Sequence, residues 1–193
     1  MRSEARKSGT GTLSAAGAKR MKPVLFAIAV GLAVGWGAEA MAQSAQNIGV
    51  FRDWNAFSST GAGDKVCFIA SQPTESKYSQ TVSGRDPAFF QVTTVPSQSI
   101  RNEASTVVGF TILTTADVTI DIDGTKFRMF LDASQPDTAW AVPEQEVQLI
   151  EAMKKGSRMI VTATSSPRQT VVTDTYSLSG VTAALNKVVE ECP

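Results

Sequence analysis

The sequence predicts a mainly β protein, either an antiparallel β-sandwich or a curled sheet of about seven to nine strands. We also expect two short helices, the C-terminal one pinned by a disulfide. Three observations support this prediction. From Asn47 onward, short β-favouring runs alternate with clusters of Gly, Pro, Asn, Asp and Ser. Two later stretches change to a helical period, and the two cysteines lie far apart in the chain. We favour the sandwich because the runs are many, short and mostly alternating.

Residues 1–42 have the features of a secretory signal peptide. Basic residues precede an uncharged apolar stretch that follows Lys22, and Ala40-Met41-Ala42 provides a small-residue cleavage site. The stretch is short for a membrane span of about 20 residues, and a retained membrane anchor is the alternative. Translation could also begin at Met21, because a complete signal starts there. We predict cleavage, which leaves residues 43–193 as a single β-rich domain without a stable transmembrane span.

The predicted mature domain is mildly acidic. The whole chain has 18 basic and 18 acidic residues; residues 1–42 hold six of the basic and two of the acidic ones, which leaves a net charge of −4. Such a domain has no excess positive charge to attract nucleic acid or anionic lipid. We therefore exclude nucleic acid as a partner. The signal predicts a location in the periplasm, at the outer membrane or outside the cell.

The first half of the domain is expected to contain three strands and one long loop. Residues 50–57 form the first expected strand, and residues 61–64 turn the chain into the second. That second strand, residues 66–70, is apolar at every position, which predicts that both of its faces are covered. Residues 72–87 are polar and contain two prolines and a glycine, so we expect a loop. The β pattern resumes at residues 88–93.

Two hairpins are expected in the second half. Residues 106–113 alternate as a strand, followed by the alternating runs 118–122 and 127–131 around Asp123-Gly124. Asp-Gly between two alternating runs predicts a type I′ turn, because glycine accepts a positive φ without strain. Residues 158–178 contain a second pair of runs, joined at Ser165-Ser-Pro-Arg168.

Residues 143–155 are expected to form a helix. Val147, Ile150 and Met153 would share its buried face. Pro143 suits the first helical position and Gly156 the position after the last turn.

A second helix is expected at the C-terminus, with Ser179 as its N-cap. Its apolar positions recur with a helical period and form one stripe: Val181, Ala184, Leu185, Val188, Val189 and Cys192. In an oxidising compartment the pair Cys67 and Cys192 predicts a disulfide, with two unpaired buried thiols as the alternative. The bond would hold this helix across the Cys67/Ile69 face of its strand.

The chain contains no histidine, and this limits the chemistry available to it. Ser-His-Asp and Cys-His arrangements and histidine-ligated zinc are excluded, and bonded cysteines leave no thiolate. We predict no enzymatic activity, no cofactor and no metal. The alternative is a calcium site or a glycosidase carboxylate pair drawn from aspartates around the expected central hairpin. These are Asp117, Asp121, Asp123, Asp132 and Asp137.

Three aromatic residues, Trp54, Phe57 and Trp140, are candidates for an interaction surface. Exposed aromatic side chains mark partner-binding surfaces, whereas core packing is the alternative. Trp140 falls in an expected connection rich in Pro and Asp. Arg85-Asp86 and Arg101-Asn-Glu103 are expected to be solvated charges in loops.

An ordered set of short segments resembles the invasion-associated locus B family. They are Asp53-Trp-Asn-Ala56, Lys65-Val-Cys-Phe-Ile-Ala-Ser-Gln-Pro73, Asn102-Glu-Ala-Ser105, Gly109-Phe-Thr111, Ile122-Asp-Gly-Thr-Lys-Phe127, Thr138-Ala-Trp140, Ala152-Met-Lys-Lys-Gly-Ser157 and Asp174-Thr-Tyr-Ser-Leu-Ser-Gly180. The resemblance covers residues 48–192 and is to the short two-cysteine branch. It implies a cell-envelope protein of Gram-negative bacteria with a β-dominated domain and no established catalytic residues. The association of the family with host-cell entry is a phenotype and not a mechanism.

Three functions remain in competition. A non-enzymatic interaction protein of the cell envelope, acting in host contact or envelope maintenance, predicts an exposed aromatic or apolar patch. A periplasmic small-ligand-binding protein predicts an enclosed pocket between sheet and helix. A carboxylate-dependent hydrolase predicts at least two carboxylates converging in a cleft. We favour the first.

Overall fold

The computed structural model describes residues 45–61 and 63–193, in which eleven strands form one antiparallel sheet. The strand order is β1-β2-β3-β5-β6-β9-β8-β7-β10-β11-β4. The predicted signal peptide lies outside the described residues. No helix in the described part of the chain combines the length and apolar character needed to cross a membrane. The mainly β class is therefore confirmed, whereas the count of seven to nine strands is too low and the favoured two-sheet sandwich is wrong.

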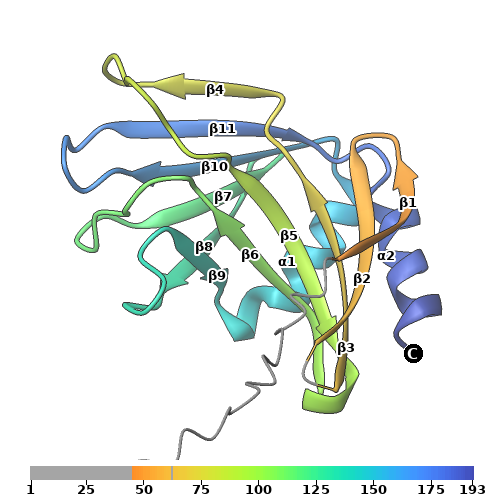
Figure 1. Ribbon diagram of the computed structural model, residues 1–193. Helices are drawn as coiled ribbons and strands as arrows, with labels where there is room; N and C mark the ends of the chain where they lie inside the picture. The colour runs from red at the N-terminus through yellow and green to blue at the C-terminus, as the bar shows by residue number, and fades with distance from the viewer. Residues whose placement is uncertain (1–44, 62) are drawn as a thin grey trace, which may run out of the picture. The chain divides into compact units, whose positions relative to one another are not determined.

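The strands and helices have the following bounds: β1 Gln46–Phe51, β2 Trp54–Gly61, β3 Asp64–Ser71, β4 Glu75–Tyr78, β5 Phe89–Val95, β6 Ile100–Val107, β7 Val118–Ile122, β8 Thr125–Leu131, β9 Thr138–Ala141, α1 Pro143–Lys155, β10 Arg158–Thr164, β11 Val171–Ser177 and α2 Val181–Glu191. A short 3₁₀ turn, Pro96–Gln98, precedes β6. In Figure 1 the strands β4, β11 and β10 cross the direction of β2 and β3, so the sheet curls strongly along its length.

A chain of aromatic side chains lies inside the curl. The rings of Trp54 and Phe90 meet edge-on at 6.4 Å, and those of Phe90 and Tyr176 at 6.1 Å. β5 and β11 are far apart in the strand order, so the Phe90–Tyr176 contact joins the two halves of the sheet. The indole Nε1 of Trp54 also donates to the carbonyl of Ser177, at 3.0 Å. A single curled sheet thus buries a core that a sandwich would place between two sheets.

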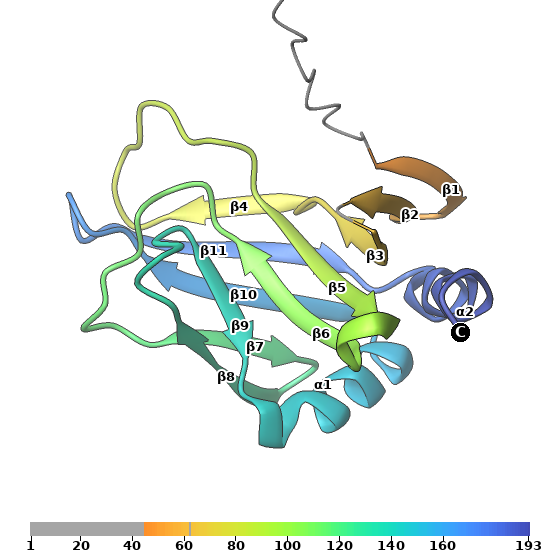
Figure 2. The ribbon, with the colours of Figure 1, turned by 60° about the horizontal axis from the view of Figure 1, so that its bottom comes forward.

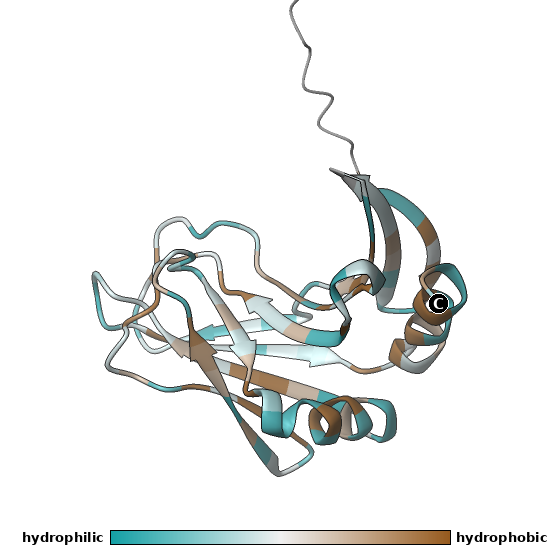
Figure 3. Ribbon diagram, turned by 90° about the horizontal axis from the view of Figure 1, so that it is seen from below, coloured by the Kyte–Doolittle hydropathy of each residue, from teal (hydrophilic) through white to brown (hydrophobic). Residues whose placement is uncertain are grey.

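The two helices cover separate parts of the inner face. α2 packs on β1, β2 and β3, and α1 packs on β6, β8 and β9, as Figures 1 and 2 show. Both helices carry hydrophobic and hydrophilic segments in turn (Figure 3). The predicted stripe of α2 is buried except for Val189, which is 58% exposed. Burial of one apolar stripe explains why these short helices are stable here.

The Asp123-Gly124 hairpin is confirmed. Ile122 pairs with Thr125, and both turn residues have positive φ, 48° and 96°, as a type I′ turn requires. The β10–β11 hairpin and the Pro143 start of α1 are also confirmed. Gly156 ends α1 with an extended backbone, and a Cβ there would lie 2.6 Å from Ile122 Cγ2. This glycine is thus required by close packing against β7.

Several element boundaries differ from the predictions. The strand expected at 50–57 is two strands, because Arg52 adopts a positive φ of 56° and turns the chain. The loop expected at 72–87 contains the edge strand β4, which a loop composition does not reveal. In place of the strand expected at 106–113, β6 begins at Ile100 and ends at Val107, and Ile112 makes only a single bridge. Trp140 lies in strand β9 and not in a connection.

Two helix details also differ from the predictions. Leu149, Ile150 and Met153 form the buried face of α1, whereas Val147 is 76% exposed. Positions 149, 150 and 153 span a narrower arc of the helix than the predicted set does. Gly180, with φ 97°, is the N-cap of α2 in place of Ser179. Gly180 lies so close to the backbone carbonyl of Phe51 that a Cβ at this position would not fit.

Candidate functional site

Three phenylalanines form a half-exposed surface on the outer face of β2, β3 and β5. Phe57 pairs with Phe68 across β2 and β3, and their rings stack at 4.9 Å with an interplanar angle of 18°. Phe89 is contributed by the start of β5 and lines the same hollow as the other two rings. We call these three residues the aromatic groove.

The pattern of strand β3 explains how this groove arises. Cys67 and Ile69 point to the inner face and are fully buried, under α2 and the core. Val66, Phe68 and Ala70 alternate with them, point outward and are only half-buried. The prediction that both faces of this apolar strand are covered is therefore wrong for the outer face. An apolar strand face without a covering layer is typical of a contact surface.

Polar groups surround the groove. Its volume is about 470 Å³, and Asp53, Asn55, Gln72 and Thr74 lie around the aromatic rings. An apolar centre with a polar rim is the composition of a protein-binding surface.

The structure separates the three aromatic residues predicted as one surface. Trp54 is completely buried, so it cannot contact a partner, and this part of the prediction is wrong. Phe57 belongs to the aromatic groove. Trp140 is half-buried on the outer face and stacks on Phe130 at 6.0 Å. β6 lies between the groove and this second pair, and Gln91 of β5 donates to Ser105 of β6 at 3.0 Å.

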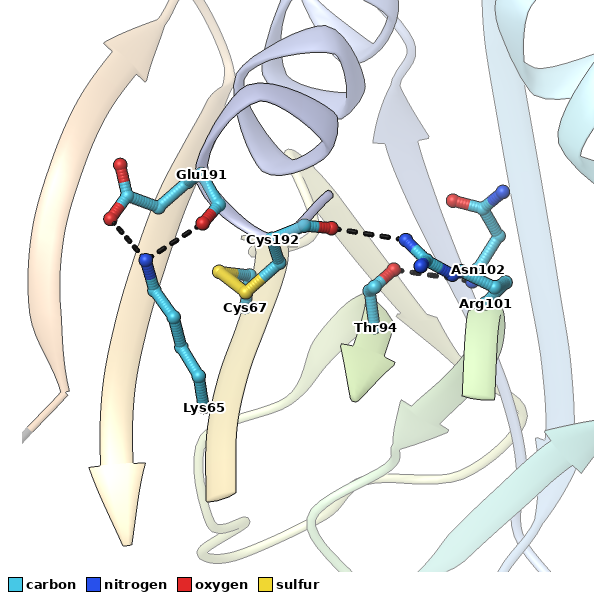
Figure 4. The surroundings of a disulfide bond; sticks show 7 residues. All are labelled: Lys65, Cys67, Thr94, Arg101, Asn102, Glu191 and Cys192. Carbon is cyan, nitrogen blue, oxygen red and sulfur yellow. Dashed lines mark hydrogen bonds and ion pairs between the residues drawn. A yellow bond between two sulfur atoms is a disulfide. The ribbon is translucent and has the colours of Figure 1, made fainter. Parts of the chain in front are cut away.

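The disulfide Cys67–Cys192 is present, as predicted, and ties α2 to β3 with a Cα–Cα distance of 6.1 Å. Figure 4 shows two cations beside it. Lys65 donates to the carbonyl and the carboxylate of Glu191, both at 2.7 Å, and Arg101 Nη1 donates to the carbonyl of Cys192 at 3.0 Å. Arg101 is therefore engaged and not a free solvated charge. Cations that bind the last carbonyls of a helix stabilise its C-terminus. Together with the disulfide, these contacts hold α2 against the inner face of β3.

A buried ion pair was missed by the sequence reasoning. Arg85 was expected to be solvated, but its guanidinium binds the Asp174 carboxylate through two contacts of 2.8 and 2.5 Å. The two side chains are 9% and 3% exposed. Arg85 Nε also donates to the carbonyl of Val108 at 2.7 Å, and the Phe110 ring centroid lies 5.2 Å away. A signal existed for Asp174, which occupies an inward position between Val172 and Tyr176. A carboxylate there must find a partner.

The aspartates of the carboxylate hypothesis make separate local contacts. Asp121 accepts from the amide of Gly124, and Asp123 from that of Ser157, each at 2.8 Å. Hydrogen bonds from the Ser157 amide hold the pKa of Asp123 below its usual value. Asp137 accepts from the hydroxyl of Thr138. Within the described residues no group of three or more His, Cys, Asp or Glu could hold a metal ion.

Asp117 and Asp132 do line one common hollow of about 700 Å³. The Asp117 carboxylate pairs with Arg128 at 3.5 Å. The amide and hydroxyl of Ser134 donate to Asp132 and lower the pKa of its carboxyl. A glycosidase requires one carboxyl whose pKa is raised so that it donates a proton. Asp132 has the opposite shift, so its carboxyl does not have the raised pKa of such a proton donor.

One curled antiparallel sheet, with a tail helix bonded to an inner strand, defines a β-dominated, disulfide-closed protein. Residues 54–189 match the model of the invasion associated locus B (IalB) protein family, and the chain belongs to that family. Among the solved structures that this chain resembles is invasion associated protein B from Bartonella henselae. That chain is 16% identical, with a TM-score of 0.49 over 74% of this chain and 95% of the other. No match is found among curated proteins.

Proposed function

We propose that this chain is an exported, non-enzymatic interaction protein of the cell envelope, which binds a protein partner through the aromatic groove of Phe57, Phe68 and Phe89. It acts in the periplasm, at the outer membrane or outside the cell, in host contact or envelope maintenance. We also propose that the chain, which has two cysteines, belongs to the short two-cysteine branch of the family.

The outer face of β3 is the observation that carries this proposal. Three apolar residues of that strand are only half-buried, whereas Cys67 and Ile69 on the opposite face are completely buried under α2 and the core. Burial of apolar area contributes about 25 cal/mol per Å². A partner that covers the groove removes its apolar surface from water, and this burial favours binding. Phenylalanine is also among the aromatic residues that are enriched in protein interfaces.

The absence of enzymatic activity is supported by the composition of the chain. It has no histidine, and its two cysteines are bonded to each other. The candidate carboxylates make local turn and side-chain contacts and do not form an acid–base pair. An interaction role requires none of these groups.

Site-specific photo-cross-linking in the producing cells tests the proposal. A photoreactive phenylalanine analogue replaces Phe68 in one variant and Phe130 in a control. Phe130 is a suitable control because it is also an aromatic residue stacked on the outer face and is 45% exposed. We expect a discrete cross-linked product from position 68 in the envelope fraction and none from position 130. An added Phe57→Ser change should remove the product, because it removes the stacked neighbour.

Two results would overturn the proposal. Cross-linking of equal yield from positions 68 and 130 would show that the groove has no special role. Persistence of the position-68 product in the Phe57→Ser variant would show that the partner does not read the groove. Thermal melts of the Phe57→Ser and Phe130→Ser variants provide the folding control, since each removes one ring from a half-exposed pair.

A further inference from the structure

A second cavity, separate from the aromatic groove, lies where three connecting segments meet. Its volume is about 270 Å³. It is bounded by the β4–β5 loop with Val82 and Arg85, by the β10–β11 loop with Pro167 and Arg168, and by Phe110. No residue of this cavity lines the aromatic groove.

The cavity combines apolar walls with positive charge. Val82, Phe110, Pro167 and Val172 provide the apolar surface. The lining contains two arginines and no acidic residue. Arg85 is neutralised by Asp174, with which it forms a buried pair. Arg168 is exposed, and among the described residues it forms no ion pair, so the cavity carries a net positive charge.

The Arg85 guanidinium forms a rigid part of the wall. It lies 5.9 Å from the ring centroid of Tyr78 and 5.2 Å from that of Phe110. Its Nε–H and both terminal nitrogens are engaged with Val108 and Asp174, which fix its orientation. A preorganised wall of this kind binds a ligand without an ordering cost.

A buried hydroxyl in the lining has no hydrogen-bond partner. Thr170 is 1% exposed, and its Oγ1 lacks a partner within residues 45–61 and 63–193. A buried polar group without a partner costs about 1–3 kcal/mol, so such a group needs an explanation. Because this oxygen is closed off from solvent, the wall must move slightly before a ligand oxygen can accept from the Thr170 hydroxyl.

We propose that this cavity binds a small monocarboxylate with a compact apolar body. The apolar walls fit the body, and Arg168 and the Thr170 hydroxyl fit the carboxylate. The volume is below the range of about 300–1,000 Å³ typical of drug-sized ligands, so the ligand is smaller than those. This site is independent of the proposed partner surface.

Octanoate is the probe for this proposal, with 1-octanol as its uncharged counterpart. Titration of the isotope-labelled mature domain, followed by amide NMR shifts, should give saturable shifts at Val82, Gly84, Thr170 and Val172. For a ligand with so few atoms we expect a Kd on the order of 1 mM. Octanol should bind more weakly, and added salt should weaken octanoate binding.

Two variants locate the charge. Arg168→Ala should weaken octanoate binding by about threefold, as expected for a partly exposed ion pair, and leave octanol unchanged. Lys126→Ala, which removes an exposed cation on β8, is the matched control and should change neither. Thr170→Val keeps the side-chain shape and should also weaken octanoate binding.

Three results would overturn the proposal. The first is the absence of saturable shifts at octanoate concentrations of about 10 mM, where a Kd of 1 mM would be largely saturated. The second is a set of shifts centred on Phe57 and Phe68, which would place the ligand in the aromatic groove. The third is equal affinity for octanoate in the wild type and the Arg168→Ala protein.

Discussion

Arg85 and Asp174 form a two-pronged ion pair inside the protein, 89 residues apart in the chain. The pair joins the loop after β4 to the middle of β11, and Ser76 of β4 adds a hydrogen bond of 2.6 Å to the same carboxylate. Burial alone would lower the pKa of Arg85, but the hydrogen bonds and charges of Asp174 and Tyr78 together outweigh this effect and raise that pKa above its ordinary value. The edge strand, the loop and the sheet are thereby held together by one charge pair.

Replacement of Arg85 by methionine should destabilise the protein strongly. It leaves the Asp174 carboxylate buried without its cation, which costs about 3–5 kcal/mol in comparable pairs. Arg128→Met is the matched control, because Arg128 and Asp117 form a pair that is about 70% exposed (72% and 71%). Chemical unfolding should show a large shift for the first variant and a small one for the second. Equal shifts would contradict a structural role for the buried pair.

The double variant Arg85→Met, Asp174→Leu should be more stable than Arg85→Met alone. Removal of both partners leaves no buried charge to desolvate, and apolar replacements of a buried pair are often neutral. The same unfolding series measures the coupling between the two sites. A double variant that loses the sum of the two single losses would show that the two groups do not act as a pair.

Loss of the disulfide should lower the stability of the protein substantially. Cys67 and Cys192 are 125 residues apart, and for a loop of this size the chain-entropy model gives about 4–5 kcal/mol. Urea unfolding with and without reductant, and of the Cys67→Ala, Cys192→Ala protein, measures the effect. Both treatments should shift the midpoint to lower urea by a similar amount. An unchanged midpoint would reject the bond as a source of stability.

Gly180→Ala should destabilise the protein more than Gly124→Ala does. Both glycines have φ near +97°, so alanine is strained at either position, by about 1–2 kcal/mol. At Gly124 no atom lies near the added Cβ, whereas at Gly180 the Cβ would collide with the carbonyl of Phe51. The difference between the two melting temperatures therefore measures the cost of the collision. Equal losses would show that the strand β1 can move away from α2.

Local patterns in the sequence are sufficient to predict the elements that depend on neighbouring residues. The Asp123-Gly124 turn is determined by the need for positive φ, and α1 by its period and its starting proline. The disulfide and the covered face of β3 follow from the stripe on which Cys192 lies. Each of these features depends on contacts within one helix or one hairpin, or on a single covalent bond, and such features can be predicted from a local pattern.

The remaining features depend on contacts between distant segments. β4 pairs with β11, which lies about a hundred residues later in the chain, and Ser76 opposite Asp174 is one of these pairs. The polar composition of β4 gives no sign of this distant partner and therefore no sign of a strand. The burial of Arg85 depends on the same region. Whether the sheet closes as a sandwich or curls depends on contacts such as Phe90 with Tyr176. The outer face of β3 is uncovered because no further element lies over it among the described residues, and strand composition cannot reveal that.

Glu146 gives a prediction about pH, because it lies one helical turn before Ile150, toward the buried face of α1. Its carboxylate accepts from the amide of Ala104 at 2.9 Å. Burial raises the pKa of Glu146 above its ordinary value of 4.5, and the nearby Glu103 adds to the shift. The folded state therefore holds this proton more tightly than the unfolded state does.

Replacement of Glu146 by glutamine should raise the melting temperature near neutral pH and have little effect near about pH 4. A carboxyl whose pKa is raised by folding costs no stability while it is protonated in both states. The cost grows as the pH rises from the unfolded pKa through the folded pKa, and then stays constant. Glutamine keeps the oxygen that accepts from Ala104 and removes the charge. Glu144→Gln, on the exposed side of the same helix turn, is the control and should give no gain in melting temperature near neutral pH, because an acidic residue in the first turn of a helix is favourable. A gain for Glu146→Gln that is equal at both pH values would mean that the charge is not its cause.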